Sequence, residues 1–194
     1  MKLKKLANNA IIFGINRVIE IFGITILLAG FLLLASLITF SPDDPNFIFP
    51  SNTEIKNILG FRGSFTADIF FQSFGVISLL VPFSLMVTGG NIILNKKFFL
   101  IIESIFYTTL YSLLGSLFFC FFYPVTFELY INGNGGFIGK YLETTVFNSL
   151  ININSQVAYY VLILLVLILF LISIQFKVNS FYVIIKKIFK YLFS

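Results

Sequence analysis

Histidine and tryptophan are absent from the 194-residue sequence, and cysteine occurs once, at Cys120. A single cysteine cannot form an internal disulfide, and without histidine the usual Cys/His zinc sites cannot be built. Charged residues are scarce too, at 11% of the chain. Without metal ligands or a paired nucleophile and base, we expect no metal, no cofactor and no catalytic residue, so the chain is predicted not to be an enzyme.

Hydrophobic residues, by contrast, make up 58% of the sequence, more than a soluble domain of this size can bury. They fall into four runs, each long enough to cross a hydrocarbon core of about 30 Å as a helix. The first run continues to Phe40, well past the length of a secretory signal core, so we expect it to be retained. The predicted fold is an all-α integral membrane domain at 19–176, with four transmembrane helices at about 19–40, 69–94, 98–123 and 157–176.

A short polar loop separates the first two runs, with the sequence SPDDPN at 41–46. Its prolines, Pro42 and Pro45, lack a backbone N–H and push the preceding residues away from helical dihedrals, so the first helix must end here. Ser64 is placed to cap the following helix. Asp68 would then lie in the first turn, where the helix dipole favours an acid.

The basic residues predict the orientation of the four helices. Ten of the thirteen flank the helix ends on one side, whereas the other side holds only Lys56, Arg62 and Lys140. Under the positive-inside rule both termini are cytoplasmic, with basic segments at 1–18 and 177–194 and outer loops at 41–68 and 124–156. The amphipathic tail should lie against the inner leaflet. In the second outer loop we expect a flexible glycine-rich start and then a short interfacial helix, because apolar residues recur there at helical spacing.

Small residues recur every four positions along the third predicted helix. Such spacing places them on one side of an α-helix, and in lipid small side chains let helix backbones approach closely. We therefore predict that the helix-packing face is formed by Ser104, Thr108, Ser112, Gly115, Ser116 and Cys120. The fourth helix has almost no small residues, so we expect it at the lipid-facing periphery.

The residues around the first outer loop form an ordered set. A glutamate and a glycine enter the first helix, Ser-Pro-x-Asp-Pro leaves it, and Asn-x-x-Gly-x-x-Gly-x-x-x-Ala-Asp enters the second, which contains a further glycine. These positions are Glu20, Gly23, Ser41, Pro42, Asp44, Pro45, Asn57, Gly60, Gly63, Ala67, Asp68 and Gly75. In this pattern and in its four-span layout, the chain resembles the N-terminal membrane domain of FtsK/SpoIIIE-type DNA translocases.

The resemblance implies a membrane anchor. It implies that the domain holds a cytoplasmic ATP-driven motor at the division septum of the bacterial inner membrane for chromosome segregation, and that it contacts other septal membrane proteins. It also implies a homo-oligomer formed through the motor of the full-length protein. The bilayer is the partner of the spans themselves. No direct contact with nucleic acid is expected, because the sparse lysines form no DNA-binding motif.

Two other interpretations are weaker. Residues 134–141 mimic the end of a phosphate-binding loop. However, Asn134 stands where the loop requires a glycine, and Tyr141 stands where it requires a serine or threonine. A small four-span transporter or channel subunit is the alternative function. Transporters place polar groups near the middle of the membrane. Glu20 and Glu103 instead lie near the cytoplasmic ends, where we expect them to pair with nearby basic residues or to snorkel to the interface.

Overall fold

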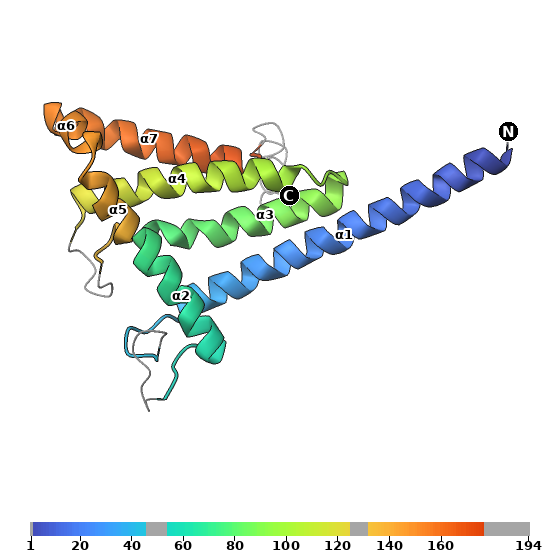
Figure 1. The fold of residues 1–194 in the computed structure, drawn as a ribbon, viewed down its shortest axis with the longest axis horizontal. Coiled ribbons are helices and arrows are strands. Elements are labelled where there is room, and N and C mark those ends of the chain that lie inside the picture. Colours follow the sequence, from blue (N-terminus) through green and yellow to red (C-terminus); the bar gives the residue numbers. More distant parts are fainter. Residues whose placement is uncertain (1, 46–53, 125–131, 177–194) are drawn as a thin grey trace, which may run out of the picture.

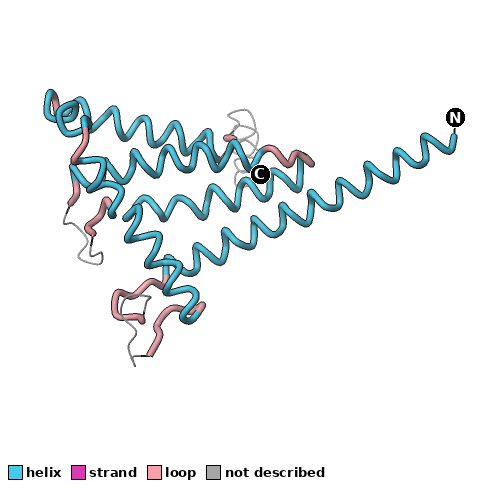
Figure 2. The backbone as a smooth tube through the Cα atoms, in the orientation of Figure 1, coloured by secondary structure: helices cyan, strands magenta, loops and turns pink. Residues whose placement is uncertain are grey.

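The computed structural model describes residues 2–45, 54–124 and 132–176, apart from the side chains of 2–7 and 146. Within these ranges all regular structure is helical, in the order α1 (Lys2–Ile38), α2 (Gly60–Phe74), the 3-10 helix η1 (Gly75–Leu80), α3 (Val81–Asn95), α4 (Leu100–Phe122), α5 (Gly136–Glu143), α6 (Val146–Ile153) and α7 (Ser155–Ser173). Figure 1 shows α1, α3, α4 and α7 following one another across the bundle. The backbone trace in Figure 2 shows the short helices gathered at one end of it.

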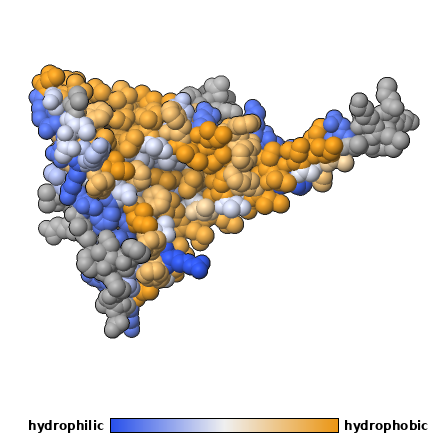
Figure 3. Space-filling view, viewed as in Figure 1, coloured by the Kyte–Doolittle hydropathy of each residue, from blue (hydrophilic) through white to orange (hydrophobic). Residues whose placement is uncertain are grey.

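In the part of the chain that the structure describes, four helical stretches are long and apolar enough to cross a membrane: Asn8–Ile38, Gly60–Asn95, Leu100–Phe122 and Ser155–Ser173. The predicted all-α membrane fold is therefore confirmed. Figure 3 shows apolar side chains over the length of the bundle, with polar ones gathered at the end formed by α2, α5 and α6. This distribution fits long helices surrounded by lipid and short helices at the surface of the bilayer.

α1 is one uninterrupted helix of 37 residues, about 55 Å long at 1.5 Å per residue, against a hydrocarbon core of about 30 Å. The predicted division between a segment at 1–18 and a span at 19–40 is therefore not a structural boundary. The helix continues because no proline interrupts it. Figure 1 shows that the N-terminal part of α1 extends beyond the other helices. Ile11, Phe13 and Val18, in the first half of α1, have exposed apolar side chains.

The second predicted span, 69–94, is divided in the structure. α2 ends at Phe74, Gly75 adopts a left-handed φ of 70°, and η1 leads into α3, where Pro82 stands in the first turn. Gly75 tolerates this φ because it has no Cβ, and Pro82 has no N–H to continue the helical ladder of the preceding turn. Figure 1 shows α2 turned away from the axis of α3. An apolar run predicts the length of a span but not this change of direction.

The prediction that Ser64 caps the second helix is also wrong. The helix begins at Gly60, so Ser64 lies in its second turn and does not cap it. Asp68 lies near the middle of α2, where its carboxylate accepts a hydrogen bond from Gln72 Nε2 at 3.3 Å. The described part of the second outer loop contains two short helices, α5 and α6, where one was predicted. The predicted tail, 177–194, lies outside the described residues.

Two hydrophobic clusters form the core. One joins α1, α2 and α3 through Leu33, Leu37, Ala67, Phe71 and Val81, and the other joins α4, α6 and α7 through Leu117, Phe118, Ile151 and Leu162.

Between α1 and α3 the backbones themselves meet, because a Cβ at Gly89 would lie 2.6 Å from the backbone nitrogen of Leu27. Small residues permit such close approach in lipid. In the most apolar stretch of α7 only 6% of the residues are buried, which agrees with a fourth span at the periphery of the bundle.

Candidate functional site

Polar side chains are concentrated where α1 ends and α2 begins. We call the set Ser36, Thr39, Asp44, Asn57 and Ser64 the α1–α2 latch. All but Thr39 are at most 4% exposed. Buried polar groups need hydrogen-bond partners within the protein, and the latch therefore determines how the first two helices are joined.

Asp44 is positioned by a tight turn. Its N–H donates to Ser41 O at 3.2 Å, which leaves Pro42 at the second position of the turn, where its fixed φ is favoured. The carboxylate of Asp44 accepts the N–H of Lys56 at 2.8 Å and the N–H of Asn57 at 2.9 Å, one on each oxygen. Hydrogen bonds to a charged acceptor contribute about 1.5–3 kcal/mol each. Asp44 thus joins the start of the first outer loop to its end.

Asn57 supplies hydrogen-bond donors to backbone carbonyls at the C-terminal end of α1. The last carbonyls of a helix have no partner within it, and Asn57 Nδ2 donates to two carbonyls here, Ser36 O at 2.9 Å and Thr39 O at 3.3 Å. Asn57 Oδ1 accepts the N–H of Leu59 at 3.1 Å, and Asn57 O accepts the N–H of Gly60 at 2.8 Å. One side chain therefore ends α1 and starts α2.

The first turns of α2 lie against α1 and the loop. Ser36 Oγ donates to Gly63 O at 2.5 Å, and Ser64 Oγ donates to Pro45 O at 3.3 Å. A Cβ at Gly63 would overlap the side chains of Asn57 and Leu59, so no larger residue fits. Ala67, on the same face of α2, is fully buried. Seven of the twelve motif positions, from Ser41 to Ala67 and excluding Gly60, meet in this small region or form its turn.

A surface ion pair lies beside the latch. Lys56 Nζ is 2.9 Å from Asp43 Oδ2, and both side chains are exposed. The hydrogen bond to Asp43 raises the pKa of Lys56, so the contribution of this pair to stability is present at neutral pH and is lost as the pH rises through the raised pKa. Exposed pairs contribute little, and we assign the join to Asp44 and Asn57 instead.

A second junction holds the other end of α2. Val76 N–H donates to Asn134 O at 2.9 Å, and Asn134, which is fully buried, donates its side-chain amide to Tyr123 O. A Cβ at Gly75 would overlap the carbonyl of Asn134. Gln72 adds a contact, because its Oε1 accepts from Asn132 Nδ2 at 3.2 Å. The described part of the glycine-rich loop is therefore packed against α2, and its expected flexibility stays a prediction. Sequence reasoning missed Asn134 as a structural residue.

Two motif residues, Glu20 and Gly23, lie away from α2, toward the other end of the bundle. Glu20 forms ion pairs with Arg17, as expected, and with Lys96, which ends α3 in a left-handed conformation. Gly23 faces α3, because a Cβ there would lie 3.0 Å from Gly89 O. Glu20 and Glu103 were each expected to pair with a neighbouring base or to snorkel to the interface. The structure describes both Glu103 and Lys97, and no ion pair joins them, but the side chain of Glu103 is exposed.

The predicted packing face of the third span faces the interior of the chain. Ser104, Ser112, Gly115 and Ser116 are buried, whereas Thr108 and Cys120 are partly exposed. Ser104 accepts a hydrogen bond from Thr88, and Ser116 donates one to Phe74 O at 2.8 Å. Gly115 faces the side chain of Ile77. Cys120 Sγ donates a hydrogen bond to the carboxylate of Glu143 at 3.2 Å. The stripe thus contacts α2, α3, η1 and α5. Its effect on stability remains a prediction.

Uncharged polar contacts join α3, α4 and α7. Ser84 Oγ lies 3.0 Å from Tyr111 Oη and 2.8 Å from Ser173 Oγ, and Asn91 Nδ2 donates to Gln175 Oε1 at 2.9 Å. Sequence analysis did not identify these contacts, because they depend on the order of the helices. Among the described residues, no three acids or cysteines gather where they could hold a metal ion. The polar groups named here form contacts between helices, as polar side chains in membrane spans commonly do.

Comparison with known proteins agrees with this geometry. A model of the 4TM region of DNA translocase FtsK/SpoIIIE matches residues 16–186. The chain belongs to this family. The matched region includes every residue of the α1–α2 latch. The resemblance inferred from the sequence is confirmed.

Two curated relatives show how much of a translocase this chain represents. DNA translocase FtsK of Rickettsia bellii (strain RML369-C) is 32% identical over 62 residues, which are 32% of this chain and 8% of the relative. DNA translocase FtsK of Rhizobium meliloti (strain 1021) is 40% identical over 60 residues, which are 27% of this chain and 7% of the relative. The alignments thus span less than a tenth of these relatives. No solved structure matches the chain.

Proposed function

We propose that the chain is the membrane anchor of a cell-division DNA translocase, holding a cytoplasmic ATP-driven motor at the septum during chromosome segregation. The observation that carries the proposal is the family match across all four spans, at residues 16–186. The relatives are named for translocation, yet the aligned segments form less than a tenth of them. We therefore assign motor activity and motor oligomerisation to other segments, and attachment to the four spans.

In this proposal both termini are cytoplasmic, and α2, α5 and α6 face the outside, where they contact septal membrane proteins. The ten basic residues on the terminal side support this orientation. The three sites best suited to test it are exposed, namely Glu54, Lys97 and Lys140. Asn134, which lies in the same outer loop as Lys140, is unsuitable as a labelling site because its side chain is buried.

Thiol labelling in whole cells tests the orientation. Single cysteines replace the three residues in turn in a Cys120→Ser background, and a membrane-impermeant thiol reagent is added. Glu54→Cys and Lys140→Cys should react, whereas Lys97→Cys should react only after the cells are opened. The opposite pattern would reject the orientation.

Localisation tests the anchor itself. The chain is fused to a fluorescent protein in a bacterium that has its own septal proteins, and we expect fluorescence at mid-cell without any motor present. Asp44→Asn should reduce this signal, whereas Asp43→Asn, a change in an exposed neighbour, should leave it intact. Uniform membrane fluorescence of the unmodified chain, or ATPase activity of the purified chain, would reject the assignment.

A further inference from the structure

A groove of about 400 Å³ lies between the last half of α1 and the first turns of α2. Ala29, Leu32 and Leu33 line it from α1, and Leu59, Arg62 and Thr66 line it from α2. Leu32 is 55% exposed and belongs to the apolar surface that α1 presents to lipid. The groove is therefore continuous with the hydrocarbon part of the bilayer.

Arg62 places a positive charge at this groove. Its side chain is exposed, and among the described residues no carboxylate forms an ion pair with it, in contrast to Arg17, Lys56 and Lys96. Thr66 cannot serve as a free donor, because its hydroxyl donates to Arg62 O at 2.7 Å. The guanidinium presents a planar set of N–H donors that fits the oxygens of a phosphate.

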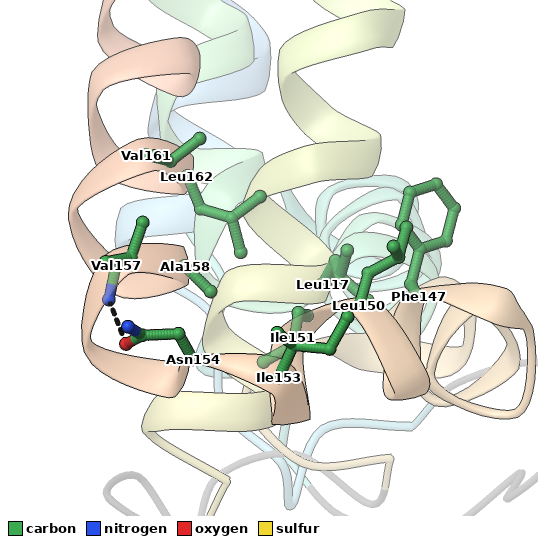
Figure 4. Close-up of a pocket in the computed structure, with 10 residues that line it drawn as sticks. All are labelled: Leu117, Phe147, Leu150, Ile151, Ile153, Asn154, Val157, Ala158, Val161 and Leu162. Carbon is green, nitrogen blue, oxygen red and sulfur yellow. Dashed lines mark hydrogen bonds between the residues drawn. The ribbon is translucent and has the colours of Figure 1, made fainter.

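A similar groove elsewhere in the chain lacks this combination. It lies between α6 and α7, has a volume of about 360 Å³, and is lined by residues such as Leu117, Phe147 and Leu162 (Figure 4). Its one polar side chain, Asn154, accepts the N–H of Val157 at 3.1 Å and caps α7. Apolar surface alone distinguishes no headgroup, so the second groove serves as an internal control.

We propose that the α1–α2 groove binds one phospholipid with an anionic headgroup, such as phosphatidylglycerol. An acyl chain lies along Ala29 and Leu32, and the phosphate contacts Arg62. The lipid belongs to the leaflet reached by the end of α1, which is the outer leaflet in the orientation proposed above. A net negative headgroup is favoured over a zwitterionic one, because the latter carries its own cation to oppose the guanidinium.

Lipid binding to the purified chain tests this site. The chain is stripped of lipid in detergent and titrated with phosphatidylglycerol or with phosphatidylcholine of the same acyl chains, and bound lipid is counted by native mass spectrometry. We expect about fivefold tighter binding of phosphatidylglycerol, the effect of one basic residue near a headgroup. Arg62→Gln should abolish the preference and Arg62→Lys should retain part of it. Lys140→Gln, which removes an exposed charge on the same side of the bundle, should leave it unchanged.

Variants that fill the grooves test the position of the acyl chain. Ala29→Phe should weaken binding of both lipids, whereas Ala158→Phe, in the groove of Figure 4, should not change the headgroup preference. Inorganic phosphate at millimolar concentration should not compete. The proposal is overturned if Arg62→Gln keeps the preference, if Lys140→Gln loses it equally, if Ala29→Phe binds normally, or if free phosphate displaces the lipid.

Discussion

Replacing Asp44 with asparagine tests the α1–α2 latch with almost no change in shape. The carboxylate accepts two backbone N–H groups, from Lys56 and Asn57, one on each oxygen. Asparagine keeps one oxygen and turns an amide N–H₂ toward the other donor, so one hydrogen bond is lost and the second loses its charge. With about 1.5–3 kcal/mol for each charged bond and about 1 kcal/mol for a neutral one, the latch should open more easily by about 3 kcal/mol.

Hydrogen exchange measures this opening directly. The amides of Lys56 and Asn57 exchange when the latch opens, and about 3 kcal/mol corresponds to roughly a 150-fold loss of protection in Asp44→Asn. Amides in the middle of α4, such as Tyr111, should keep their protection, because they lie in another part of the core. Asp43→Asn is the matched control, since it weakens an exposed ion pair and should change protection by less than about fivefold. Equal protection in Asp44→Asn and the unmodified chain, or equal loss in both variants, would refute the reasoning.

Two further predictions concern helix packing. A Cβ at Gly89 would lie 2.6 Å from the Leu27 backbone nitrogen, whereas a Cβ at Gly90 meets nothing within 4 Å, so Gly89→Ala should cost about 1–3 kcal/mol of stability and Gly90→Ala should be neutral or stabilising. Thermal unfolding of both variants in the same detergent checks this, and equal melting temperatures would contradict the close approach of α1 and α3. In α4, Ser116→Leu should destabilise the fold more than Leu113→Ala, because Ser116 is fully buried and bonded to Phe74 O whereas Leu113 is only partly buried. Equal losses in the same assay would remove the small-residue stripe as a packing face.

The sequence was most informative where a property depends on neighbours along the chain. The boundaries of α4 and α7 fall within three residues of the predicted spans, because the length of an apolar run determines where a helix can leave the bilayer. The turn at Pro42 was equally accessible, since a proline restricts its own φ and the residue before it. Membership of the family followed from the spacing of turn residues and acids in the same region.

The misses share a different physical cause, which is a partner distant in the sequence. Ser64 was expected to cap a helix, but Asn57 and Asp44 already fix its start, through bonds to residues up to 21 positions away. Glu20 gains Lys96 as a partner 76 positions along the chain. The break at Gly75 is stabilised by Asn134, on another loop. Local pattern shows that these residues are polar or small but not which group each one meets.

The two junctions give α2 a defined role in the fold. The latch fastens its first turns to the end of α1, and the contact of Val76 with Asn134 fastens the chain just after its last turn to the loop that precedes α5. A helix held at both ends cannot rotate about one hinge, so its exposed face keeps a fixed position relative to the bundle. That face carries Arg62 and one wall of the lipid groove. In the described structure Asp44, Asn57, Gly63 and Gly75 therefore act together to hold a short helix across one end of the membrane domain.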